Sequence, residues 1–239
     1  IPFQLDDDGL PDIVGTSSGQ SGGLTLATNH GAGGFRGALG RKQPIESVRM
    51  ELADMDGDGR LDCVSTDATI GVAVMPGTAN ERFDAPTSYL VLDLLSDLAV
   101  ADVTADGWPD VIVSVADADG GLRLLANDGT GQLLPPQEVA TSGGLTRACA
   151  AGDVNGDGHV DVLAADGLSV KLAVRLGDGS GGLAPPRVFP LDPGPRDMVV
   201  GDLDGDGRDD VLVVSGGVGA LDMSVFMGST VGGLVPAAP

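Results

Sequence analysis

Aromatic and basic residues are scarce in this chain of 239 residues. It has one Trp, one Tyr and five Phe, and its 13 Lys and Arg face 35 Asp and Glu, for a formal net charge of −22. No run of cations is long enough to follow a phosphate backbone, so we expect no nucleic-acid partner. The longest apolar runs, such as residues 111–115, have the length of a strand, so we expect no membrane insertion.

Cysteine and histidine are also rare. Cys63 and Cys149 fall in predicted strands of different repeats; we interpret them as buried thiols, with a disulfide left open. His30 and His159 lie far apart in predicted turns, and no serine-hydrolase, zinc-protease or phosphate-binding glycine motif is present. We therefore predict that the chain is not an enzyme, although 35 acids leave a carboxylate pair of the glycosidase type open.

The chain is rich in apolar residues and in glycine. Apolar side chains make up 42% of it, and 39 residues are Gly. This composition allows a buried core, and it suits many short strands joined by tight turns. No segment shows a sustained helical period, which excludes a helical solenoid.

An acidic loop of nine residues occurs five times, each time directly before a β-branched stretch. The second copy, residues 54–62, has the sequence Asp-Met-Asp-Gly-Asp-Gly-Arg-Leu-Asp. The first to fifth acidic loops start at residues 4, 54, 102, 153 and 202, so that successive starts are 48 to 51 residues apart. A fixed period near fifty indicates one supersecondary unit repeated along the chain.

The loop pattern is typical of a calcium site. Oxygen-bearing side chains at positions one, three, five and nine, the carbonyl of position seven and Gly at position six let a short loop wrap a hard cation. Thr104 and the amide Gln4 replace acids, so the third and first sites should be weaker. The predicted side-chain ligands are Gln4, Asp6, Asp8 and Asp12; Asp54, Asp56, Asp58 and Asp62; Asp102, Thr104, Asp106 and Asp110; Asp153, Asn155, Asp157 and Asp161; and Asp202, Asp204, Asp206 and Asp210. The predicted carbonyl ligands belong to Arg60, Trp108, His159 and Arg208.

Other loop classes fit less well. An EF-hand needs a bidentate Glu at position twelve and flanking helices, whereas position twelve here lies in a predicted strand. A dockerin fails for the same reason, and thrombospondin-like calcium repeats are spaced more closely and carry regular Cys. Asp and Gly also form plain β-turns, but five copies in register favour a metal. Of the 35 acids, 17 are predicted ligands, and such close carboxylates repel one another unless a cation lies among them. We expect three to five Ca²⁺ ions.

Each repeat also predicts four antiparallel strands. A stretch of small and apolar residues precedes each loop, as in 148–152, and a second strand follows it, as in 110–115. A third strand, such as 71–75, leads to a Gly-rich turn ending in Phe or Leu. Pro86, Pro136, Pro185 and Pro236 are placed where a fourth, edge strand would begin. Four strands in about fifty residues predict a β-propeller blade. The expected repeats, within a single domain 1–239, are 1–47, 48–96, 97–145, 146–195 and 196–239.

Taken together, the acidic loop, the strand behind it and the Gly-rich turn with Phe or Leu and Pro resemble the FG-GAP (VCBS, integrin-α-like) repeat over essentially the whole chain. The resemblance implies an all-β propeller whose calcium loops join the first and second strands of each blade. Members of this family resemble seven-bladed wheels, so we expect either a five-bladed ring or five blades of a larger propeller.

The expected function is a non-enzymatic, calcium-stabilised module for recognition, adhesion or scaffolding. Sites without the bidentate Glu should bind at about 10⁻⁴ M, which places a filled protein outside the cell or on its surface. Its partner would be a protein or glycan on a propeller face, or the chain would be part of a larger assembly. The alternatives are a lectin, for which Trp108 is the only indole plane, and a secreted hydrolase or its accessory domain. Trp108 is more simply explained as a residue that packs on Pro109.

Overall fold

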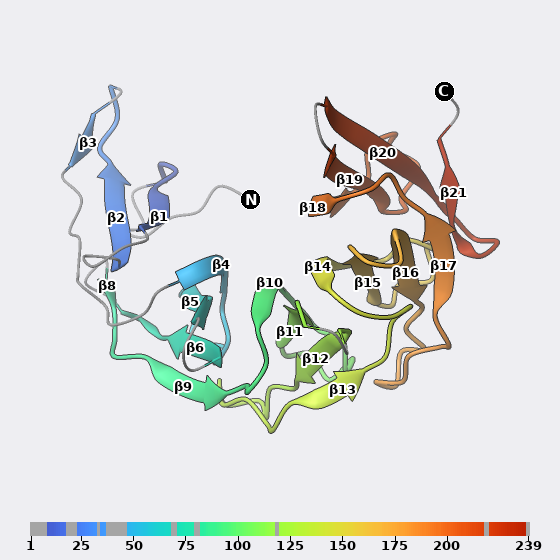
Figure 1. Ribbon diagram of the computed structural model, residues 1–239. Helices are drawn as coiled ribbons and strands as arrows, with labels where there is room; N and C mark the ends of the chain where they lie inside the picture. Colours follow the sequence, from blue (N-terminus) through green and yellow to red (C-terminus); the bar gives the residue numbers. More distant parts are fainter. Residues whose placement is uncertain are drawn as a thin grey trace. The chain divides into compact units, whose positions relative to one another are not determined.

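Strands and turns make up the described part of the chain. The structure, a computed structural model, describes residues 9–17, 23–32, 34–36, 47–67, 71–78, 82–117, 120–217 and 220–237, and its regular elements are strands β1 to β21. In those residues, no helix is long and apolar enough to cross a membrane. The chain divides into two compact units, Ile1–Leu92 and Asp93–Pro239, which are described separately (Figure 1).

The second unit consists of three antiparallel sheets of four strands, each in chain order. The first sheet contains β10 (Leu95–Ala101), β11 (Asp110–Val115), β12 (Leu122–Leu125) and β13 (Gln137–Val139). The second contains β14 (Thr146–Gly152), β15 (Asp161–Asp166), β16 (Lys171–Arg175) and β17 (Arg187–Pro190). The third contains β18 (Pro195–Gly201), β19 (Asp210–Gly217), β20 (Ala220–Ser229) and β21 (Gly233–Pro236).

The first unit follows the same plan. One sheet has the order β4-β5-β6-β9, a three-stranded sheet has the order β1-β2-β3, and β7 and β8 form a two-stranded ribbon. Their bounds are β1 (Ile13–Ser17), β2 (Gly23–Asn29), β3 (Phe35–Arg36), β4 (Ser47–Ala53), β5 (Asp62–Asp67), β6 (Gly71–Met75), β7 (Gly77–Thr78), β8 (Arg82–Phe83) and β9 (Thr87–Leu90).

The core lies between successive sheets of the repeat. Every residue of β11 and β15 is buried, in keeping with runs of Val, Leu and Ile that are apolar on both faces. Between the second and third sheets of the second unit, Ala148 and Leu163 pack in one cluster with Val213 and Phe226. Small residues on the first strand let the neighbouring sheet approach closely. Each fully buried Val or Leu contributes about 1.5–3 kcal/mol through the hydrophobic effect.

The predicted strands are largely confirmed. β6 and β11 have the predicted bounds, and β9, β13 and β17 begin shortly after the predicted prolines. The prediction for Pro236 was wrong, because β21 ends at this residue. Gly232 and Gly233 both have positive φ, so the chain turns back at once after β20 and pairs with Phe226–Ser229. The predicted strand 1–5 lies outside the described residues.

Both cysteines are buried thiols and form no disulfide. Burial, followed by the charge of neighbouring Asp62, raises the pKa of the Cys63 thiol to about 12. A thiol with such a pKa stays protonated and unreactive at neutral pH.

Candidate metal centres

The acidic loops lie where they were predicted, between the first and second strands of a sheet. The second loop joins β4 to β5, and the third, fourth and fifth loops precede β11, β15 and β19. Gln4, Asp6 and Asp8 of the first loop lie outside the described residues, and only its last acid, Asp12, is placed.

The Asp at position one organises the loop through its backbone. In the fourth loop, Asp153 accepts the N–H of Gly156 with Oδ1 and the N–H of Gly158 with Oδ2, both at 2.7 Å. Asp54 and Asp202 form the same pair of bonds to the glycines at positions four and six. These amides fix the carboxylate in the centre of the loop. Two such bonds also hold the pKa of Asp202 below its usual value.

The acids at positions three and five each accept one backbone N–H of their own loop. Asp204 Oδ1 accepts the N–H of Asp206 at 3.1 Å, and Asp206 Oδ1 accepts the N–H of Arg208 at 3.0 Å. A carboxylate offers about four acceptor sites. Each side chain therefore keeps capacity for a cation while it shapes the turn.

The Asp at position nine is buried and bridges two segments. Asp210, which is 1% exposed, accepts the N–H of Leu203 with Oδ2 at 2.9 Å and the N–H of Gly228 with Oδ1 at 2.7 Å. Asp62 and Asp161 form the equivalent pair of bonds. This residue ties the start of the loop to the end of the third strand or to the residues just after it. The loop motif by itself did not predict this role.

Burial raises the pKa of several of these bridging carboxyls. The pKa of Asp161 is raised to about 6, chiefly by desolvation, while the N–H bonds from Gly177 and Val154 oppose the shift. The pKa values of Asp62 and Asp110 are raised for the same main reason. The charges of Asp56 and Asp54 add to the shift at Asp62. A cation among these acids would oppose this repulsion.

Two of the loops bring three carboxylates together. Oxygen atoms of Asp54, Asp56 and Asp58 lie within 4.8 Å of one another, and so do those of Asp202, Asp204 and Asp210. In the fourth loop, the amide of Asn155 donates to Asp157 at 2.9 Å. The third loop has Thr104 at this position, and no comparable group of acids is found in the described part of that loop.

The side chains of the residues at position seven contact other residues of the same blade. Arg60 and Arg208 form ion pairs with Asp58 and Asp206, the acids at position five of their own loops. The rings of Trp108 and His159 instead lie against glycines of the turn after the third strand. The indole Nε1 is 3.0 Å from where a Cβ on Gly129 would be, and the imidazole covers Gly179 in the same way. Trp108 therefore packs on this turn rather than on Pro109 alone.

The bridging Asp meets one of two residue types at the end of the third strand of the blade or just after it. In the first and third repeats it binds the N–H of an Asn, whose side-chain amide donates to the carbonyl of Pro11 or Pro109 at 3.1 Å. In the other repeats it binds the N–H of Gly77, Gly177 or Gly228. A Cβ at these glycines would lie 2.3–2.8 Å from the carbonyl oxygen of position eight, so only Gly fits.

A calcium ion fits the residues of the second and fifth loops. The converging donors are carboxylate oxygens, which hard divalent cations prefer, and position six is an unobstructed Gly with φ of +84° in both loops. The acid at position five already carries a positive partner, because Arg60 pairs with Asp58 and Arg208 pairs with Asp206. In the fifth loop, Asp206 lies outside the group of three converging acids. The fourth loop fits less fully, and the third least.

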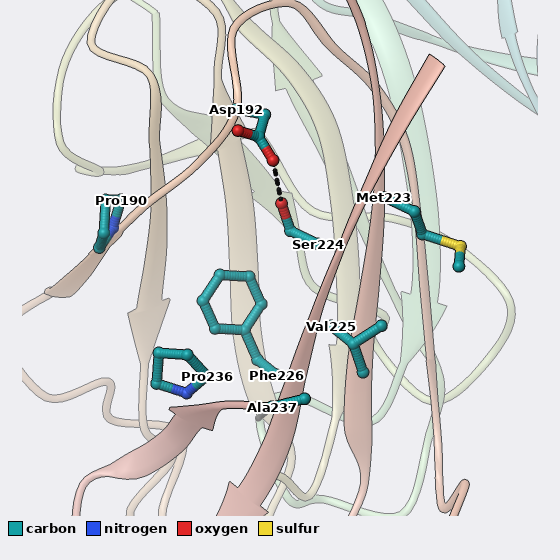
Figure 2. A pocket seen from close by; sticks show the side chains of 8 residues that line it. All are labelled: Pro190, Asp192, Met223, Ser224, Val225, Phe226, Pro236 and Ala237. Carbon is teal, nitrogen blue, oxygen red and sulfur yellow. Dashed lines mark hydrogen bonds between the residues drawn. The ribbon is translucent and has the colours of Figure 1, made fainter. Parts of the chain in front are cut away.

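A separate hollow of about 370 Å³ lies in the second unit between the end of β17 and strands β20 and β21 of the third sheet. Figure 2 shows the Asp192–Ser224 pair at one end, joined by a 3.0 Å hydrogen bond, and Phe226 with Pro236 at the other. No local sequence pattern marks this site, because its residues come from β17, β20, β21 and the segments next to them. The lining residues are Pro190, Asp192, Met223, Ser224, Val225, Phe226, Pro236 and Ala237.

Solved structures with a similar fold include proteins of different activities. The BP39L lectin from Burkholderia pseudomallei gives a TM-score of 0.70 at 18% identity, over 95% of this chain and 66% of the lectin. An α-L-arabinanase from Penicillium chrysogenum gives 0.62 at 16% identity, over 94% and 74% of the two chains. The biofilm matrix protein Bap1 from V. cholerae gives 0.57 at 20% identity, over 95% and 37%. The chain thus spans just under two thirds of the lectin, and these similarities support the propeller fold without identifying an activity.

The repeat itself matches a known family. A comparison with curated protein sequences gives no match. The model of the FG-GAP-like repeat, however, matches residues 4–65, 54–113, 102–164 and 153–213, each match starting at an acidic loop. The fold is all-β, with four-stranded antiparallel blades repeated about every fifty residues, and the chain belongs to the FG-GAP-like repeat family.

Proposed function

We propose that the acidic loops bind Ca²⁺ and that the bound ions stabilise a non-enzymatic extracellular module for recognition or scaffolding. The observation that carries this proposal is the convergence of three carboxylates within 4.8 Å in the second and fifth loops. When bound, calcium supplies positive charge that offsets the repulsion between these acids. The other calcium loops are the fourth and, with lower affinity, the third and first.

Within each loop the residues have separate tasks. The acids at positions one, three and five bind the ion, and position seven adds its carbonyl. At position nine, Asp210 and its equivalents bind the ion while they hold the loop against the third strand. The ion therefore braces a connection that the hydrogen bonds already define, and its role is structural.

The surroundings of the histidines support a non-catalytic role. Nε2 of His30 hydrogen-bonds to Thr28 Oγ1 at 3.0 Å, and the ring of His159 is packed against Gly179. Within the described residues, neither ring forms a hydrogen bond with a carboxylate that would orient it as a general base. The extracellular address follows from the expected affinity, because sites near 10⁻⁴ M fill only where calcium is abundant.

Calorimetric titration of the chelated protein with Ca²⁺, with a thermal melt at each end, tests the proposal. We expect three to five ions and a large rise in Tm. Each site at 100 times its Kd adds about 2.7 kcal/mol. No binding would remove both the metal and the extracellular assignment.

A glycan is a second candidate ligand, because of the hollow beside Phe226. It combines apolar walls with the exposed Asp192–Ser224 pair. The walls could contact the C–H groups of a sugar, and the polar pair could form hydrogen bonds with its hydroxyl groups. A glycan array with the wild type and Asp192→Ala provides the test. Binding that is lost in the variant supports this site, whereas equal binding by both proteins places the glycan elsewhere.

A further inference from the structure

Two hydrogen bonds join the fourth and fifth acidic loops directly. The N–H of Asp209 donates to the carbonyl of Asp153 at 2.9 Å, and the N–H of Asp153 donates to Asp209 Oδ2, also at 2.9 Å. Asp209 occupies position eight of the fifth loop, and Asp153 occupies position one of the fourth. Both peptide groups of Asp153 are therefore held by a residue 56 positions away.

The contact between the two loops extends beyond this pair. The methylenes of Arg208 cover Gly156, with Cγ 2.8 Å from where a Cβ would lie. The N–H of Ser229 donates to the carbonyl of Val154 at 2.9 Å. Gly152 leaves the space that Asp209 fills, since a Cβ there would lie 2.5 Å from its Oδ2.

No other loop has an acid at this position. Position eight is Pro11, Leu61, Pro109 or Val160 in the other repeats, and none of these side chains can accept a hydrogen bond. Asp209 was not among the predicted ligands, and its carboxylate faces the neighbouring loop. Its charge therefore serves a contact that is specific to this pair of loops.

We propose that Asp209 couples the calcium sites of the fourth and fifth loops, so that an ion bound in one raises the affinity of the other. This inference rests on the proposed calcium binding. Asp209 lies between Arg208, whose carbonyl is a ligand, and Asp210, the last acid of its loop. An ion that orders the fifth loop thus fixes Asp209, which fixes the backbone of Asp153 in the fourth. Binding linkage makes the effect reciprocal.

The fourth loop can be observed alone if the single Trp is moved into it. Trp108→His with His159→Trp exchanges residues between equivalent positions, which both pack on a turn glycine. Luminescence of Tb³⁺ sensitised by this Trp, and its displacement by Ca²⁺, then report the affinity of the fourth loop. The measurement is made in this background with the fifth loop intact and with Asp204→Ala and Asp206→Ala combined.

We expect loss of the fifth loop to weaken the fourth by about fivefold or more, the lower range of allosteric coupling. With Asp209→Val, which copies Val160, this difference should fall below about twofold. Asp209→Asn retains an acceptor oxygen and should keep the coupling. Asp222→Val, which removes an exposed acid from β20, is the charge-matched control and should also keep it.

The possible failures are distinct. Absence of Tb³⁺ luminescence and of calorimetric calcium binding refutes the calcium proposal itself. Binding to the fourth loop that does not depend on the fifth refutes coupling while calcium binding stands. Coupling that persists in Asp209→Val, in protein whose melt in EDTA shows that it is folded, refutes the role of Asp209.

Discussion

The third and fifth acidic loops share a backbone framework but differ in the carboxylates that they bring together. In both, the Asp at position one accepts the N–H of position six. The Asp at position nine accepts the N–H of Asn127, just after β12, or of Gly228, near the end of β20. The fifth loop gathers three carboxylates, whereas the third has Thr104 where the fifth has Asp204. The hydrogen bonds of the loop backbone are retained when Thr replaces one of the acids. The fold of the loop therefore does not depend on how many carboxylates its nine residues supply.

Removing the bridging acid should have the largest effect and should be nearly independent of calcium in the third loop. Asp110 is fully buried and accepts the N–H groups of Val103, Thr104 and Asn127. Asp110→Ala leaves three amides without an acceptor, so we expect a loss of about 3–5 kcal/mol in the free energy of unfolding. Denaturant unfolding in calcium and in EDTA measures it. For Asp210→Ala, the loss should be greater in calcium than in EDTA; equal losses would show that Asp210 is not a ligand.

Removing the acid at position five should give the clearest difference between the third and fifth loops in calcium-dependent stability. Asp206→Ala should lower stability by about 2.7 kcal/mol at calcium 100 times the Kd and change the EDTA-treated protein little. Asp58→Ala should behave in the same way. Asp106→Ala, the matched change in the third loop, should have a smaller calcium-dependent effect. Thermal melts in calcium and EDTA provide the measurement, and similar losses in both conditions would assign these acids to the turn alone.

A substitution at position four of the third loop should increase stability by a small amount. Ala105 has φ of +56°, where the equivalent Gly57, Gly156 and Gly205 have φ of +75° to +82°. The left-handed conformation costs a non-glycine residue about 1–2 kcal/mol, partly offset by the greater unfolded-state entropy of Gly. Ala105→Gly should therefore stabilise the protein by about 0.5–1 kcal/mol with or without calcium. Adding Thr104→Asp should make the gain larger in calcium, as a titration of the double variant would show.

The opposite end of the β14–β17 sheet supplies a buried acid without a metal loop. Asp166 is fully buried and accepts hydrogen bonds from Ser142, Thr146 and Ser169, and burial raises its pKa above the usual value. Since the folded pKa exceeds the unfolded one, its contribution to stability is present below about pH 4 and is lost as pH rises through the folded pKa. Asp166→Asn should flatten this part of the stability–pH profile measured in EDTA. An unchanged profile would mean that Asp166 does not titrate in this range.

Local patterns in the sequence predicted the repeat, the strands and the loops. The strand-length apolar runs and the spacing of Asp and Gly are local features of the sequence, so the bounds of β6 and β11 follow from them. The bridging by Asp210 and the contact of Asp209 join residues 18 and 56 positions apart. Periodicity carries no information on such pairs. Asp209 could be recognised in the sequence because no other repeat has an acid at position eight. Its partner, Asp153, could not be identified from the sequence.

The residue at position eight of a loop goes with the type of residue, Asn or Gly, whose N–H the bridging Asp binds. This relation matters for the design of repeat proteins. Pro11 and Pro109 occur with Asn29 and Asn127, whereas Leu61, Val160 and Asp209 occur with Gly77, Gly177 and Gly228. A consensus chosen column by column would treat these positions as independent. Blades of the Pro–Asn type given Gly would lose an amide donor, and blades of the other type given Asn would clash with a carbonyl. The two columns are structurally coupled, so a blade transplanted into another repeat protein should keep both.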